Sequence, residues 1–165
     1  MKTLTLITLS SLLVAGAVSA QVEVVFEDPE SFRDIDYGHH NTQRGIKVHL
    51  PQIEKHIQKQ AKRFLEEGQT LSMTITDLDL AGDYEPWRSP SWDDVRIVKS
   101  IYPPRIQFTY ELKDAEGNVL SSGEEKITDI AFEYRVRLSS YDELFYDKAM
   151  ITDWMRKMVR EVNKG

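Results

Sequence analysis

A short acidic string in the middle of the chain carries the residue types best suited to holding a hard cation. Asp77, Asp79 and Gly82 occupy the first, third and sixth positions of a calcium-binding loop counted from Asp77. The fifth position is Ala81, and the twelfth, where a bidentate glutamate completes such a loop, is Arg88. The string therefore matches a calcium loop only weakly.

Two further carboxylates, Asp83 and Glu85, follow the string and would supply oxygen ligands to calcium or zinc in some other geometry. The alternative is structural. In that interpretation Asp77 forms a partly buried ion pair with Arg96 or Arg105 and fixes the register of its strand. We favour the ion pair, because an unpaired buried carboxylate is strongly unfavourable.

Adjacent histidines offer a second candidate metal site. His39 and His40 lie together in a polar segment. Two neighbouring histidines rarely bind one metal ion without a third ligand, which Asp34, Asp36 or the Asp77 string would have to supply. Such a cluster would suit a small metal-assisted hydrolase.

Aromatic side chains gather in an irregular, proline-containing stretch, and these are the best candidates for a binding surface: Tyr84, Trp87, Trp92 and Tyr102. Large aromatic residues on loops often make recognition surfaces. The alternative is a lid that packs over an open end of the core.

Composition excludes several other kinds of chemistry. The chain has no cysteine, so it carries neither a thiol nucleophile nor a disulfide. No G-x-S-x-G motif marks a serine nucleophile. The net charge of −6 argues against nucleic acid as the main partner, because binding to phosphates requires a basic surface. No cofactor is expected beyond a possible calcium or zinc ion.

The first twenty residues predict export. Lys2 precedes an apolar run from Leu4 to Val18, and the run ends in small residues up to Ala20. The run is shorter than the roughly 20 residues that span a bilayer. We therefore expect a signal peptide over residues 1–20, cleavage near Gln21, and a single periplasmic domain over residues 21–165 that does not insert into the membrane.

Apolar periodicity predicts two helices. The first begins near His49 or Leu50 with Pro51 in its first turn, or alternatively near Gln43 with a kink at Pro51, and Gly68 follows its end. The second begins at a capping box made by Ser140 and Glu143, and its apolar stripe includes Trp154.

Alternating apolar and polar residues predict strands over residues 22–26, 71–76, 95–98, 106–112, 119–128 and 130–136. After Thr76 the alternation changes phase, which indicates a β-bulge near Asp77. The fold class that follows is α+β: a mostly antiparallel sheet of four to five strands with two helices packed on one face. If the first two strands are neighbours, a right-handed crossover makes them parallel.

Three segments together carry a resemblance to a known family: the string Thr-Asp-Leu-Asp-Leu-Ala-Gly-Asp-Tyr-Glu-Pro at 76–86, the Pro-Arg-Ile at 104–106, and a helix with Tyr146, Lys148 and Ala149 that runs to Trp154. The chain resembles the domain of unknown function 3016 family of exported bacterial proteins. The resemblance implies the compartment and the fold, and it implies no activity.

Two functional hypotheses remain. The first is a non-enzymatic periplasmic module that holds an envelope protein or a glycan through the loop between Tyr84 and Tyr102, or through an exposed sheet edge. The second is a metal-assisted hydrolase that uses Asp77 and Asp79 with His39 or His40.

Overall fold

The computed structural model describes residues 20–38, 40–88, 94–136 and 142–164. The expected signal peptide, His39, Trp92 and Ser140 lie outside these ranges.

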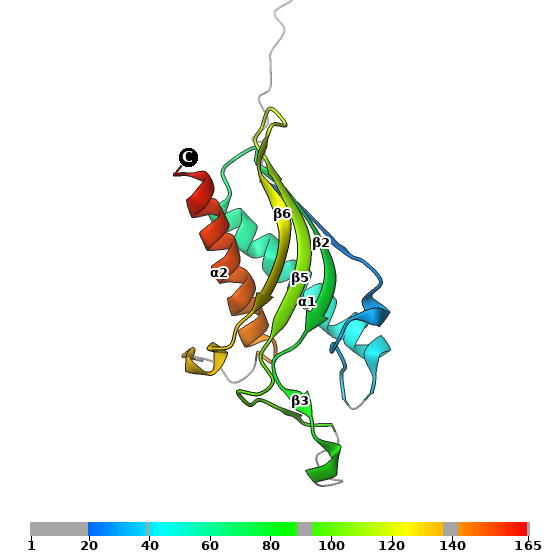
Figure 1. The fold of residues 1–165 in the computed structure, drawn as a ribbon. Helices are drawn as coiled ribbons and strands as arrows, with labels where there is room; N and C mark the ends of the chain where they lie inside the picture. The colour runs from blue at the N-terminus through cyan, green and yellow to red at the C-terminus, as the bar shows by residue number, and fades with distance from the viewer. Residues whose placement is uncertain (1–19, 39, 89–93, 137–141, 165) are drawn as a thin grey trace, which may run out of the picture.

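A four-stranded sheet forms the body of the domain, in the order β1 (Gln21–Phe26), β2 (Thr70–Asp79), β5 (Arg105–Lys113) and β6 (Val119–Thr128) (Figure 1). β1 is parallel to β2, whereas β2–β5 and β5–β6 are antiparallel pairs. A two-stranded sheet of β3 (Asp83–Tyr84) and β4 (Arg96–Ile97) lies beyond the end of β2. The α+β class is confirmed, with a mixed sheet.

The bulge expected in β2 is present. Leu71, Met73 and Ile75 alternate into the core, the register with β5 shifts between Ile75 and Asp77, and Leu78 is again buried. One extra residue in the strand reverses which side chains face the core. The bulge therefore leaves Asp77 and Asp79 on the outer face at the end of β2.

The first helix, α1 (Thr42–Phe64), begins well before His49, so the preferred start was wrong and the alternative start near Gln43 was close. The side chain of Asn41 caps the helix by accepting a hydrogen bond from the backbone N–H of Arg44 at 3.1 Å. Pro51 lies inside the helix. Gly68 has a positive φ but comes after the C-cap residue Leu65, in the following turn.

The second helix, α2 (Phe145–Val162), packs with α1 on one face of the sheet (Figure 1). Its N-cap residue is Leu144, so the capping box expected at Ser140 does not start the helix. Its buried side chains include Ile151, Trp154 and Met155, as the apolar stripe predicted. The two helices and the sheet enclose one apolar core.

The strand expected over residues 130–136 is absent. This stretch contains a 3₁₀ turn, Phe132–Tyr134, in which Phe132 is buried while Ile130 and Tyr134 are exposed. Arg135 closes the turn through ion pairs with Asp129 and Asp153. The alternation of apolar residues over 130–136 wrongly indicated a strand, because the single buried side chain of Phe132 is enough to anchor a turn.

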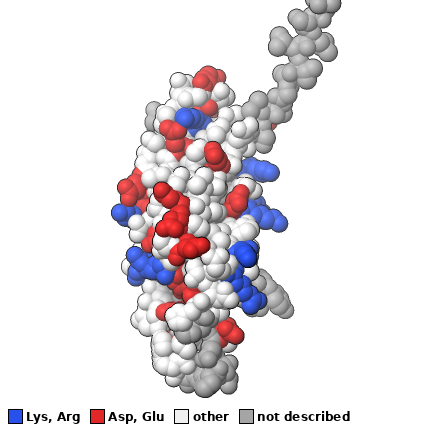
Figure 2. All heavy atoms as spheres, turned by 90° about the vertical axis from the view of Figure 1, so that its right-hand side faces the viewer, with Lys and Arg blue, Asp and Glu red and all other residues white. Residues whose placement is uncertain are grey.

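Acidic side chains form a band along the face of the molecule that is turned toward the viewer in Figure 2, with Lys and Arg at its two sides. In the described part of the chain, no helix is long and apolar enough to cross a membrane.

Candidate functional site

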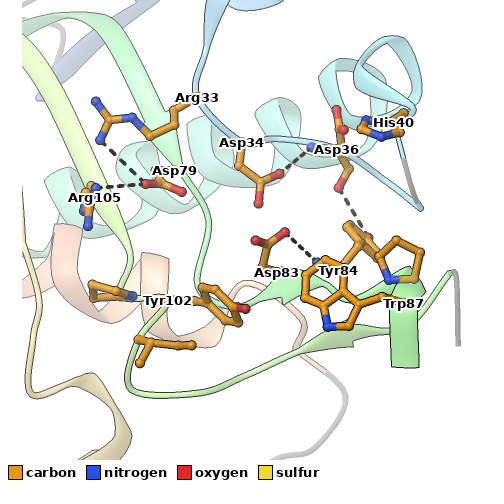
Figure 3. Close-up of a pocket in the computed structure, with 14 residues that line it drawn as sticks. Arg33, Asp34, Asp36, His40, Asp79, Asp83, Tyr84, Trp87, Tyr102 and Arg105 are labelled. Carbon is orange, nitrogen blue, oxygen red and sulfur yellow. Dashed lines mark hydrogen bonds and ion pairs between the residues drawn. The ribbon is translucent and has the colours of Figure 1, made fainter. Parts of the chain in front are cut away.

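A cleft of about 700 Å³ opens where β2 ends and the β3–β4 sheet begins (Figure 3). Three segments line it: the loop after β1, the stretch from the end of β2 to a 3₁₀ turn at Pro86–Arg88, and the segment that leads into β5. The lining residues are Arg33, Asp34, Asp36, His40, Asp79, Gly82, Asp83, Tyr84, Pro86, Trp87, Ile101, Tyr102, Pro103 and Arg105.

The parallel pairing of β1 with β2 brings the first segment to the cleft. Beyond β1, the chain continues beside the end of β2: the N–H of Asp34 donates to the carbonyl of Leu78 at 3.1 Å, and the N–H of Leu80 donates to the carbonyl of Asp34 at 2.9 Å. Asp34 thereby makes a parallel bridge with Asp79. Charged residues from both segments meet at this edge of the sheet.

Asp79 contacts two arginines that come from different segments. One of its oxygens, Oδ2, is 3.7 Å from Nη1 of Arg33 and 3.6 Å from Nη1 of Arg105 (Figure 3). Burial, and next the negative charge of Asp34, raise the pKa of Asp79 to about 6, against the opposing effect of the two arginines. The carboxyl group of Asp79 therefore changes its charge at mildly acidic pH.

The predicted partner of Asp77 was wrong. Oδ1 of Asp77 accepts the backbone N–H of Arg33 at 2.9 Å, and Oδ2 lies 3.5 Å from Nη2 of Arg33. Arg96 and Arg105, the expected partners, pair with Asp34 and Asp79 instead. The partner comes from the loop after β1, whose position could not be read from residue spacing.

Arg96 joins the segments that form the cleft. Its two Nη atoms donate to both carboxylate oxygens of Asp34 at 2.7 and 2.9 Å, and to the carbonyls of Gly82 and Asp36 at 2.9 and 3.0 Å. Its guanidinium also lies 4.6 Å from the ring centre of Tyr84. Burial alone would lower the pKa of Arg96, but the hydrogen bonds and charge of Asp34 raise it overall. Arg96 is thus fully used in holding the loop, β3 and β4 together.

Three of the four aromatic residues named from the sequence line this cleft. Trp87 is 73% exposed, so most of its indole surface is open to solvent. The hydroxyl of Tyr84 accepts the N–H of Gly38 at 2.8 Å, and the hydroxyl of Tyr102 donates to Glu85 at 2.9 Å. The two tyrosines are therefore tied into the walls of the cleft. The fourth, Trp92, lies outside the described residues.

The acidic and histidine candidates divide into two groups. Asp79, Asp83 and His40 line the cleft, whereas Asp77 and Glu85 do not. Glu85 is buried and pairs with Lys99. Among the residues that the structure describes, no three His, Asp or Glu side chains lie close enough together to hold a metal ion.

Sequence reasoning did not single out Arg33, although it lines the cleft and contacts both Asp77 and Asp79. It treated Arg105 only as a partner for Asp77. The parallel crossover was the available signal. Because the first two strands run in the same direction, the loop that follows the first strand lies beside the end of the second.

Comparison with known proteins identifies the family. A family model described as "Protein of unknown function (DUF3016)" matches residues 20–157. The chain belongs to the DUF3016 family. No curated protein matches it.

Some solved structures show a weak likeness. A PelC dodecamer from Paraburkholderia phytofirmans is 13% identical, with a TM-score of 0.33 and 92% of each chain covered. A minor lipoprotein from Acinetobacter baumannii is 8% identical, with a TM-score of 0.31 and 90% of this chain and 94% of that chain covered. Likenesses this weak carry no information about the function of the present chain.

Proposed function

We propose that this DUF3016 protein is an exported, non-enzymatic module that binds a component of the bacterial envelope in the cleft at the end of β2. The observation that carries the proposal is Trp87, which is 73% exposed and lines the cleft. A tryptophan left open to water beside a concave polar surface is a typical anchor for a ligand, because covering it removes a large apolar area from water.

The rest of the cleft supports the same function. Its volume of about 700 Å³ falls within the usual size of small-ligand sites. Hydrogen-bond donors come from Arg33 and Arg105, and acceptors come from Asp36 and Asp83. A ligand with many polar groups and one flat apolar face would match this lining.

The export part of the proposal rests on the first twenty residues of the sequence. A cleaved signal peptide would release a periplasmic protein that begins near Gln21, where β1 also begins. N-terminal sequencing of the protein from a periplasmic extract should find Gln21 or a close neighbour. An intact Met1 in the membrane fraction would contradict export by cleavage.

Binding can be tested by co-sedimentation of the mature protein with purified peptidoglycan sacculi, and by its retention on immobilised lipopolysaccharide. The variant Trp87→Ala should lose about tenfold in affinity, because an aromatic anchor is worth at least ~1.4 kcal/mol. Tyr134→Ala is the matched control, since Tyr134 is an exposed aromatic residue outside the cleft. Equal binding by both variants and the wild type would contradict the proposal.

Metal analysis of the same purified protein separates the two functional hypotheses. Stoichiometric zinc or calcium, together with a melting temperature that shifts on addition of a chelator, would favour the metal-assisted hydrolase over the binding module.

A further inference from the structure

Among the side chains that the structure describes, three arginines lie at the cleft, and they differ in exposure and in the number of hydrogen bonds that they make. Arg96 makes four hydrogen bonds, and its side chain is 16% exposed. The side chains of Arg33 and Arg105 are 48% and 41% exposed, and their contacts with Asp77 and Asp79 are 3.5–3.7 Å long. Within the described residues, neither of these two guanidiniums makes a hydrogen bond.

Long ion pairs leave the hydrogen-bonding capacity of Arg33 and Arg105 largely unused. A guanidinium has five N–H donors and forms short, paired hydrogen bonds with a carboxylate when the geometry allows it. The two side chains instead converge on one oxygen of Asp79 (Figure 3). The carboxylates that line this end are Asp79 and Asp34, and both oxygens of Asp34 already accept hydrogen bonds from Arg96, whereas the N–H groups of the two guanidiniums remain available. This end is therefore suited to an anionic group.

The other end of the cleft has a different character. Trp87 and Tyr84 lie there with Asp36 and Asp83 nearby (Figure 3). Oδ1 of Asp36 accepts the hydroxyl of Thr42 at 2.7 Å, and Oδ1 of Asp83 accepts the N–H of Tyr84 at 2.7 Å. In the described part of the chain, the second oxygen of each carboxylate has no hydrogen-bond partner. Both oxygens are acceptors for a hydroxyl group.

We propose that the cleft binds an acidic saccharide, with a sugar carboxylate on Arg33 and Arg105 and a sugar ring stacked on Trp87. A uronic acid unit fits this lining, since its carboxylate suits the guanidiniums, its hydroxyls donate to Asp36 and Asp83, and the C–H face of a ring packs on indole. This inference rests on the proposed binding function and adds the class of ligand.

The test is isothermal titration calorimetry on the mature protein with three probes: a linear tetramer of galacturonic acid, maltotetraose, and a peptide of four glutamates. The galacturonate should bind at least about tenfold more tightly than maltotetraose, since hydrogen bonds to a charged group contribute more than neutral ones. It should also bind more tightly than the peptide, which has the charge but no sugar ring.

Variants assign the binding to individual side chains. Arg33→Gln and Arg105→Gln should each weaken galacturonate binding about tenfold and leave maltotetraose binding unchanged. Arg160→Gln is the control, because Arg160 is an exposed arginine in the last turn of α2 and does not line the cleft. Arg105→Lys tests geometry, since it keeps the charge and loses the planar fork. Each variant's melting temperature shows whether it is folded.

The outcomes separate this inference from the proposed function. If maltotetraose binds as tightly as galacturonate, or if Arg160→Gln weakens binding as much as Arg33→Gln, the acidic-saccharide inference is overturned while a binding module stands. If the glutamate peptide binds most tightly, the ligand is a protein segment and the inference fails. If no probe binds and Trp87→Ala changes nothing in the co-sedimentation assay either, both proposals fail.

Discussion

The carboxylate of Asp147 accepts a hydrogen bond from the backbone N–H of Ala81 at 3.0 Å, and this contact joins the first turn of α2 to the chain just beyond β2. Asp147 is completely buried, and its second oxygen has no hydrogen-bond partner among the described residues. Burial raises the pKa of Asp147 to about 6. The helix is thus connected to the cleft wall through a carboxyl group that holds its proton more tightly than an ordinary aspartate does.

The raised pKa of Asp147 predicts a dependence of stability on pH. A carboxyl group whose pKa is higher in the folded state than in the unfolded state holds its proton more tightly when folded. Its contribution to stability therefore falls as the pH rises from about 4 to about 6, and is constant above that range. Asp79, whose pKa is also raised to about 6, contributes in the same direction.

The variant Asp147→Asn keeps an acceptor for Ala81 and cannot ionise. Its stability relative to the wild type should rise by roughly 1–3 kcal/mol between pH 4 and pH 7. Urea unfolding at several pH values measures this difference, with Glu67→Gln as a control at an exposed carboxylate. A difference that does not change with pH would mean that Asp147 has an ordinary pKa.

Asp77→Asn should lower the free energy of unfolding by about 1 kcal/mol in the absence of metal, because Arg33 would lose a counter-ion and keep its hydrogen bond. Thermal melts of wild type and variant, each with chelator and with added calcium or zinc, provide the measurement. If a metal ion raised the melting temperature of the wild type alone, Asp77 would be a metal ligand. An unchanged melt under every condition would make Asp77 a solvated carboxylate with no structural role.

Trp154→Ala should cost about 3–5 kcal/mol, because the indole is almost fully buried between α2 and the sheet. Its ring meets Phe108 edge-on at 4.6 Å and Tyr110 at 5.1 Å between ring centres. Lys157→Ala is the control on the same helix, because its side chain is exposed and lies 3.8 Å from Glu161. Similar, small shifts of the urea midpoint for both variants would contradict this packing.

Gly45→Ala should destabilise the protein by about 3 kcal/mol or more. A Cβ at Gly45 would lie 1.7 Å from the backbone oxygen of Ile35, so α1 and the loop before it would have to separate. Gly123→Ala should be tolerated to within about 0.5 kcal/mol, since its Cβ would meet Tyr110 at an ordinary 3.5 Å. Thermal melts of the two variants side by side test the close approach at Gly45, and equal melting temperatures would contradict it.

Local patterns in the sequence were sufficient for most of the sheet. The alternation in Leu71, Met73 and Ile75 predicted β2, and the change of phase after Thr76 predicted its bulge, because side chains in a strand alternate strictly between two faces. The same rule failed at residues 130–136. There Phe132 alone is buried, and a period of two does not distinguish a strand from a turn with one anchor.

The start of α1 shows the limit of local signals at element ends. Pro51 was expected in the first turn, where its missing N–H costs nothing, yet the helix runs through it from Thr42. Tertiary packing determines where α1 begins. Gly45 lets α1 approach the backbone of Ile35 closely, and the contact holds the first turns of the helix against the loop.

Residue types alone named Asp79, Asp83, Tyr84, Trp87 and Tyr102 as site candidates, and these five line one cleft. Which charges meet there was decided by the tertiary structure. Arg33 reaches Asp77 and Asp79 because β1 and β2 are parallel neighbours, which places a loop more than forty residues earlier in the chain beside the end of β2. Such long-range pairing depends on the packing of the whole sheet and its crossover helix, and the spacing of residues in the sequence does not record it.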